Sequence, residues 1–130
     1  MKPFLTASDY KTIHTLILNL PPQLKGKEVI QLQHEIKSAE IVPDGQLSPD
    51  IIQINSYFEV LDLETQRLMK FQVVLPHLAD LKQFKISILS PLGVAMIGFR
   101  QGMTVEWTLP GGRKRLQINQ VDNPIRSTQI

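Results

Sequence analysis

The chain has 130 residues, of which 42% are hydrophobic and 20% are charged. This balance is typical of a globular domain and excludes a disordered or fibrous class, and the length suits one core with a small extension. Because cysteine is absent, disulfides, a thiolate nucleophile and cysteine-ligated zinc are excluded. The formal charge of +2 and the pI of about 9.0 are only weakly basic, whereas dedicated nucleic-acid binders usually carry a stronger positive patch.

The sequence shows no secretory signal and no membrane span. Its first residues lead directly into polar positions and lack the apolar stretch of a signal peptide. The longest apolar run, residues 92–99, contains two glycines and falls well short of the roughly 20 residues that cross a bilayer. We therefore expect a cytoplasmic protein.

Residues 1–42 predict a short antiparallel helical hairpin. Apolar residues recur three and four positions apart in two segments, which is the spacing of one helix face. Thr6 or Ser8 can cap the first helix, and Pro21-Pro22 ends it. The short connection, 21–27, favours antiparallel neighbours whose apolar faces pack together. These faces are Tyr10, Ile13, Ile17 and Leu20 in the first segment, and Val29, Leu32, Ile36 and Ala39 in the second.

Residues 43–50 predict a linker, because they hold two prolines and a glycine and show little periodicity. From residue 51 the apolar positions alternate with polar ones, which predicts a domain of about five antiparallel strands over 51–121, followed by a tail, 122–130. The Pro110-Gly111-Gly112 segment predicts a tight turn. The expected core-facing residues are Met69, Phe71, Val73 and Leu75, then Phe84, Ile86 and Ile88, then Val105, Trp107 and Leu109, and finally Leu116 and Ile118.

One short apolar helix is expected between the third and fourth strands of this domain. Ser90 is a favourable N-cap, Pro91 suits the first helical position, and Gly98 suits the left-handed residue beyond the last turn. A helix this apolar must be buried against the sheet. The sequence thus predicts an α+β fold, with a helical hairpin ahead of a sheet covered by one helix.

These motifs together carry a family resemblance. Residues 51–121 resemble the C-terminal domain of the GreA/GreB transcript-cleavage factors, and above all their relative Rnk, the regulator of nucleoside diphosphate kinase. The Ser-Pro pair that opens an apolar helix, the glycine that closes it and the Pro-Gly-Gly turn are specific only in combination. The matching residues are 86–98, Gly102, Trp107 and 109–112.

The resemblance implies an FKBP-like fold for residues 51–121 and binding to bacterial RNA polymerase near the rim of its secondary channel. In the family, the loop that carries the Ser-Pro pair takes part in docking on the polymerase. The positions that match this loop here are Ser90, Pro91, Leu92 and Gly93. We expect them to form the contact with RNA polymerase.

The hairpin tip argues against transcript cleavage. Gre factors use a long coiled coil that carries a pair of carboxylates to the polymerase active centre. Here each expected helix has about 14 residues, or about 21 Å, and the tip offers Lys25 and Lys27 where a divalent cation would require carboxylates. Glu28 is a single acid. We therefore expect a polymerase-binding regulator with no catalytic residue, no metal and no cofactor, which competes with Gre factors.

Other functions and another oligomeric state are compatible with the sequence. The basic run Arg113, Lys114 and Arg115 could touch nucleic acid, so a protein- or RNA-binding adaptor that acts away from polymerase is the alternative. Strand alternation sends Lys114 to the face opposite its two neighbours, however, and a solvated hairpin is the favoured interpretation of this run. A peptidyl-prolyl isomerase is suggested by fold analogy alone, and the 6% of aromatic residues make an aromatic pocket hard to furnish. The short hairpin could also support a weak dimer in place of a monomer.

His14 and His34 are expected to be ordinary surface histidines, and His77 is expected to be structural. His14 and His34 lie on different helices of the hairpin, and two imidazoles without a third ligand are a poor zinc site. His77 follows Pro76 in a loop and has no sequence partner that suggests a catalytic triad.

Overall fold

A computed structural model describes residues 2–109 and 112–124 of the chain. The expected turn through Pro110 and Gly111 and the expected burial of the Trp107 and Leu109 side chains lie outside what the structure describes. The elements are, in chain order, β1 (Phe4–Thr6), α1 (Ala7–Asn19), the 3-10 turn η1 (Pro22–Leu24), α2 (Lys27–Lys37), β2 (Glu40–Val42), β3 (Tyr57–Asp62), β4 (Arg67–Val74), the 3-10 turns η2 (Pro76–Leu78) and η3 (Leu81–Gln83), β5 (Lys85–Ser87), α3 (Pro91–Met96), β6 (Thr104–Leu109) and β7 (Gly112–Asp122).

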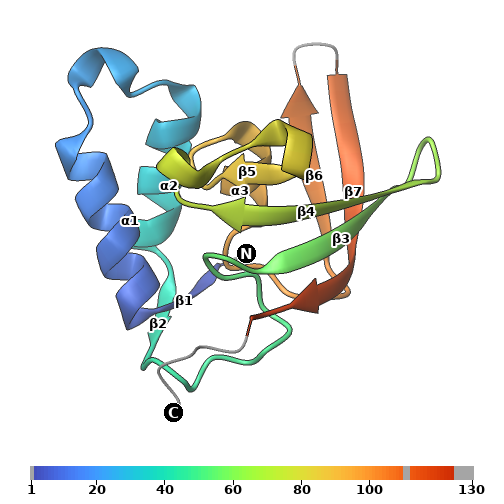
Figure 1. The fold of residues 1–130 in the computed structure, drawn as a ribbon, viewed down its shortest axis with the longest axis horizontal. Coiled ribbons are helices and arrows are strands. Elements are labelled where there is room, and N and C mark those ends of the chain that lie inside the picture. Colours follow the sequence, from blue (N-terminus) through green and yellow to red (C-terminus); the bar gives the residue numbers. More distant parts are fainter. Residues whose placement is uncertain (1, 110–111, 125–130) are drawn as a thin grey trace.

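The α+β class is confirmed, but the sheet is not fully antiparallel. Its strand order is β5-β4-β3-β7-β6, and every neighbouring pair is antiparallel except β4 and β5. The prediction of an all-antiparallel sheet is therefore wrong at one pair. The physical reason is the connection 75–84, in which η2 and η3 carry the chain back so that β5 enters in the same direction as β4 (Figure 1).

The alternation along the strands places one sheet face against the core. Phe58 and Val60 of β3 are buried and pair with Phe71 and Met69 of β4, so the expected core face of β4 is confirmed. Phe84 is a correction, because it is 62% exposed and lies just before β5 with a positive φ of 58°. A residue in this conformation leaves the strand alternation that the sequence pattern assumes.

The N-terminal elements begin with a capped helix. The Thr6 hydroxyl accepts a hydrogen bond from the Asp9 N–H at 3.1 Å, which makes Thr6 and not Ser8 the N-cap of α1. Figure 1 shows α1 and α2 side by side at one end of the molecule, joined through η1. We call residues 7–37 the helical pair. Its apolar stripe is buried at Ile13, Ile17, Val29, Leu32 and Ile36.

A two-stranded parallel sheet, β1 with β2, closes the helical pair at its base and was not expected from the sequence. The same N-terminal segment also meets the turn after α3, where the Phe4 N–H donates to the Gly98 carbonyl at 2.9 Å. Gly98 has φ +84°, as its expected role after the helix requires, and a Cβ there would lie 2.4 Å from Pro3 Cβ. The absence of a side chain at Gly98 therefore lets the N-terminal segment pack directly against the end of α3.

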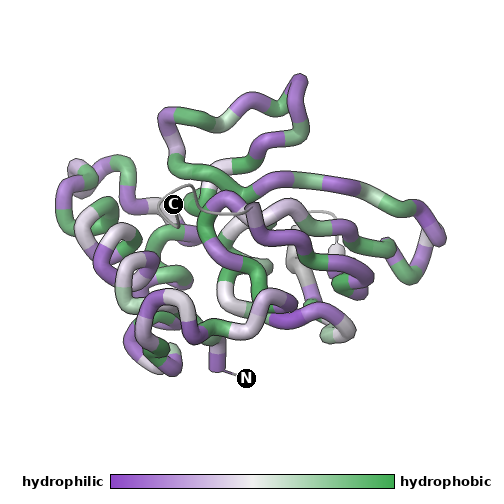
Figure 2. The backbone as a smooth tube through the Cα atoms, turned by 60° about the horizontal axis from the view of Figure 1, so that its bottom comes forward, coloured by the Kyte–Doolittle hydropathy of each residue, from purple (hydrophilic) through white to green (hydrophobic). Residues whose placement is uncertain are grey.

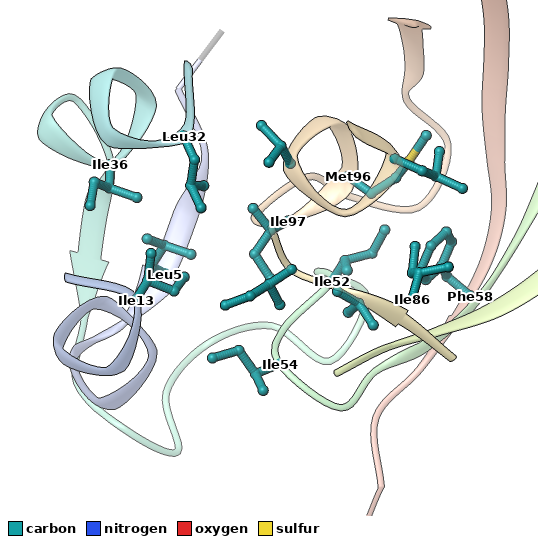
Figure 3. Packing of buried hydrophobic residues seen from close by; sticks show 14 of the residues in the cluster. Leu5, Ile13, Leu32, Ile36, Ile52, Ile54, Phe58, Ile86, Met96 and Ile97 are labelled. Carbon is teal, nitrogen blue, oxygen red and sulfur yellow. The ribbon is translucent and has the colours of Figure 1, made fainter. Parts of the chain in front are cut away.

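One hydrophobic cluster joins the two parts of the chain. Leu32 and Ile13 from the helical pair, Ile97 after α3, and Ile52 and Phe58 from the sheet side belong to the same buried group (Figure 3). α2 contacts α3 directly, and α3 contacts β5 and β6. The boundary expected at 43–50 remains a prediction, but apolar packing runs across it.

No helix in the described ranges is long and apolar enough to cross a membrane. Figure 2 shows short polar and apolar stretches alternating along the backbone. The apolar stripe of the helical pair is used within the chain, so it supplies no free surface for the weak dimer considered above, and the oligomeric state stays a prediction.

Candidate functional site

The segment between β5 and α3 carries the four residues expected to dock on a partner. The Ser90 hydroxyl accepts a hydrogen bond from the Gly93 N–H at 3.1 Å and donates to the Ser87 carbonyl at 2.6 Å. Pro91 takes the first position of α3, where no backbone N–H is needed. The expected N-cap and first helical residue are thus confirmed, and they fix the start of the helix.

Only part of this segment is accessible to a partner. Pro91 is exposed and Ser90 is half-buried, whereas Leu92 is 6% exposed and packs in the core. Gly93 is buried, and a Cβ there would lie 2.2 Å from the Ser87 carbonyl oxygen. The docking role of the four residues remains a prediction. The structure places Ser90 and Pro91 at the surface, and it places Leu92 and Gly93 where they hold that surface in shape.

The tip of the helical pair, residues 18–30, combines apolar and basic groups. Lys27 is exposed and Lys25 is half-buried, and three apolar side chains nearby in sequence are exposed as well. These are Leu18 at 63%, Leu24 at 61% and Ile30 at 58%. The sequence reading missed these residues, although their places outside the apolar stripe were a usable signal. The tip thus presents apolar surface with positive charge beside it.

The basic run near the start of β7 is divided by strand alternation, as expected. The Lys114 ammonium lies 3.1 Å from the Asp62 carboxylate, whose side chain is 2% exposed. Arg113 lies 3.7 Å from Glu106 on the other face, in a pair exposed on both sides. Arg115 is also exposed. Since Lys114 is held by Asp62, the three cations do not form one surface, and nucleic-acid contact through them stays a prediction.

The surroundings of Asp62 strongly lower the pKa of its carboxyl. The hydrogen bond from Lys114 lowers the pKa of Asp62 to about 2, and the backbone N–H groups of Glu64 and Thr65 lower it further against the opposing effect of burial. Those N–H groups donate to Asp62 Oδ1 at 3.0 and 3.3 Å. The arrangement fixes the turn between β3 and β4, which makes it structural.

The histidines do not assemble a metal site in the part of the chain that the structure covers. His14 stacks on Tyr10 with the ring centroids 5.9 Å apart. Among the residues described, no group of three or more histidine, aspartate or glutamate side chains is placed to hold an ion. The absence of a zinc site stays a prediction.

Comparison with known proteins places this architecture in a family. The family model for the C-terminal region of transcription elongation factor GreA/GreB matches residues 47–123. Curated relatives include transcription elongation factor GreA of Acidiphilium cryptum, 33% identical over 69% of this chain, and that of Bradyrhizobium diazoefficiens, 35% identical over 72%. The chain covers only 57% and 60% of the lengths of these two relatives.

Solved structures extend the likeness to 95% of this chain. A prokaryotic transcription elongation factor GreA/GreB from Nitrosomonas europaea is 27% identical, has a TM-score of 0.79, and is matched over 95% of this chain and 99% of its own. GreA factor homolog 1 of Thermus thermophilus, 18% identical with a TM-score of 0.52 over 95% and 100% of the two chains, shares the fold alone. The chain therefore belongs to the GreA/GreB C-terminal family of transcription elongation factors.

Proposed function

We propose that this protein is a cytoplasmic regulator that binds bacterial RNA polymerase near the secondary channel and does not stimulate transcript cleavage. In this proposal the FKBP-like domain docks through the surface formed by Ser90 and Pro91, supported from beneath by Leu92 and Gly93. The helical pair acts as a short antiparallel hairpin. By occupying the site that Gre factors use, the protein competes with them.

Family membership and the exposed start of α3 support the docking part of this proposal. The match at residues 47–123 includes the whole Ser-Pro segment. Ser90 binds Ser87 and Gly93, so the segment is held in one conformation before any partner arrives. A preorganised surface loses less entropy on binding than a mobile loop does.

The dimensions and charge of the helical pair support the absence of cleavage. α1 has 13 residues and α2 has 11, which correspond to about 20 and 17 Å of helix. The helices pack against the core along their apolar stripe, and their tip carries Lys25 and Lys27 with Glu28 as its acid. A hard divalent cation prefers several carboxylate oxygens, which this tip does not offer in the described residues.

Binding can be tested with purified core polymerase. We expect the protein to be retained by immobilised polymerase and to be displaced by GreA. Pro91→Asp should weaken retention, because it places a charge on the docking surface while aspartate remains acceptable in the first turn of a helix. Pro43→Asp, the same change at another exposed proline, is the control and should bind normally. Equal retention of both variants, or none of the unmodified protein, would refute the docking proposal.

Cleavage needs a separate assay on backtracked elongation complexes. We expect no shortening of the RNA when the protein is added, and slower shortening when it is added together with GreA. Lys25→Glu combined with Lys27→Glu should reduce this competition if the tip contacts an acidic surface, while Lys11→Glu on the exposed side of α1 should leave it intact. Rapid RNA shortening by the protein alone would overturn the proposal.

A further inference from the structure

A pocket of about 270 Å³ lies across β3, β4 and the end of β7, and none of its lining residues belongs to the Ser90–Pro91 surface. The residues that line it include the aromatic residues Tyr57, Phe71 and Phe84 and the charged residues Glu59, Lys70 and Asp122. Tyr57 and Glu59 alternate with buried Phe58 and Val60, so they point away from the core.

Phe84 is held at this pocket in a conformation that is unfavourable for its side chain. Its φ is +58°, in the left-handed region where a bulky residue is uncommon and where glycine carries no penalty. The Phe84 N–H donates to the Leu81 carbonyl at 3.1 Å, and the Phe84 carbonyl accepts from the Gln72 N–H at 2.9 Å. The backbone is therefore fixed from both sides, and the side chain is presented there at a cost in strain.

Burial of the Phe84 ring offsets little of this backbone strain. Phe84 is 62% exposed and Tyr57 is 51% exposed. The Phe84 ring meets only the edge of the core, in a T-shaped contact with Phe71 whose centroids are 6.4 Å apart. A glycine at this position would avoid the strain of the positive φ. A phenylalanine at a buried position would gain more hydrophobic stabilisation. An exposed aromatic side chain on strained backbone is a feature of binding sites.

The charges of the pocket indicate what it would bind. Glu59 and Asp122 contribute two carboxylates against the single ammonium of Lys70, which lies 3.8 Å from Glu59 and is itself 82% exposed. This lining is negative on a molecule whose formal net charge is +2. Aromatic faces beside carboxylates form the environment that attracts a guanidinium or ammonium group, through cation–π contact and ion pairing together.

We propose that this pocket binds a segment of a partner protein that presents an arginine side chain next to an apolar residue. The guanidinium stacks on the Tyr57 ring and pairs with Glu59 or Asp122, which share the outward face of the sheet with Tyr57, while the apolar neighbour covers the exposed Phe84 ring. This site is separate from the docking surface proposed above and does not depend on polymerase binding. It gives the protein a second, independent contact.

The proposal can be tested by titrating the isotope-labelled full chain with the peptide acetyl-Leu-Arg-Leu-amide and following the backbone amide resonances by NMR. We expect saturable shifts confined to Tyr57, Glu59, 70–72, Phe84 and Asp122. The same peptide with citrulline in place of arginine has the same shape without the charge and should bind at least about threefold more weakly. Equal binding of the two peptides, or no saturable shift at these residues, would overturn the proposal.

Variants separate a binding role from a structural one. Phe84→Gly relieves the strained backbone and removes the ring, so we expect an unchanged or higher melting temperature together with loss of saturable peptide shifts. Leu81→Ala is the matched control, because Leu81 is 78% exposed on the same connection and does not line the pocket; it should bind the peptide normally. A lower melting temperature for Phe84→Gly with peptide binding retained would show that the ring serves stability and refute the inference.

Discussion

The helical pair and the sheet region contribute to the same core, but they differ in how their sequence is constrained. In the sheet region, the start of α3 depends on backbone approaches that leave no room for a side chain, as at Gly93. In the helical pair, contact with the rest of the molecule is made by interchangeable aliphatic side chains such as Ile13 and Leu32. The family model likewise matches residues 47–123 and leaves the helical pair outside.

This difference suggests how the family can vary. A helix that is attached through an apolar stripe can change its length or tip residues while the stripe is kept, because cores tolerate substitutions that preserve volume and pattern. A helix start fixed by a glycine in backbone contact cannot change in this way. We therefore expect substitutions in the sheet region to affect folding sharply and those at the tip of the helical pair to affect function first.

The largest effect is expected at Gly93. A Cβ at this position would lie 2.2 Å from the Ser87 carbonyl oxygen and 3.0 Å from Ile88 Cα. Both are backbone atoms and cannot move aside without displacing β5 or α3. Gly93→Ala should lower the free energy of unfolding by about 3 kcal/mol or more, measured by urea denaturation.

Gly26→Ala is the control from the helical pair. Its added Cβ would meet only the end of the Glu28 side chain, at 3.6 Å, which is an ordinary contact. We expect a change within about 1 kcal/mol. Comparable losses for the two variants would remove the contrast between the regions.

The next effect tests whether the two regions share one core. Ile13 is fully buried in the cluster that also contains residues of the sheet region, and Ile13→Ala should cost about 2 to 5 kcal/mol. Because packing is continuous across residues 43–50, the helices and the sheet should still unfold in a single transition. Two transitions, followed by far-UV circular dichroism and by NMR of sheet residues, would show instead that the regions are independent domains.

The same two regions show which parts of the fold could be predicted from the sequence. The helices and their stripe, the Ser90 cap and the core face of β4 follow from local periodicity and capping chemistry, so they were predictable. The parallel β4–β5 pair and the β1–β2 sheet were not, because pairing depends on how distant segments return to one another. A three-residue strand such as Phe4–Thr6 carries too few alternating positions to be recognised.

The candidate sites divide in the same way. The start of α3 was found because a Ser-Pro pair has a local meaning, although burial of Leu92 became visible only once α3 was packed. The pocket near Phe84 joins residues from four separate stretches of the chain, and no sequence pattern connects them. The positive φ at Phe84 was equally hidden, because phenylalanine gives no sign of a left-handed conformation.

The Lys114–Asp62 pair gives a pH-dependent prediction within the sheet region. The pKa of Asp62 is lowered from 3.8 to about 2, first of all by the hydrogen bond from Lys114, so the pair stabilises the fold above pH 4 and this contribution is lost as the pH falls towards 2. Lys114→Met should therefore lower the melting temperature at pH 7, and its difference from the unmodified protein should shrink to nothing between pH 4 and 2.

Arg113→Met is the matched control for this measurement. The Arg113–Glu106 pair is 3.7 Å long, with side chains 74% and 62% exposed, and exposed pairs contribute little. We expect almost no change in melting temperature at either pH. If Lys114→Met behaved in the same way, Asp62 would be stabilised by its backbone N–H donors alone.

The smallest effect is expected at Glu35 in the helical pair, and it has the opposite sign. Burial raises the pKa of Glu35 above 4.5, against the hydrogen bond from Gln31 and the charge of His34, and its Oε2 accepts no hydrogen bond from the described residues. The charged form is therefore disfavoured in the folded state at pH 7, and this penalty disappears as the pH falls below 4.5. Glu35→Gln should raise the free energy of unfolding at pH 7 by up to about 0.5 kcal/mol and lose that advantage at pH 4.

Glu40→Gln, at an exposed position, is the control and should change the free energy of unfolding at neither pH. A destabilised Glu35→Gln variant would contradict the prediction, because it would mean that the Glu35 carboxylate makes a favourable contact in the folded protein.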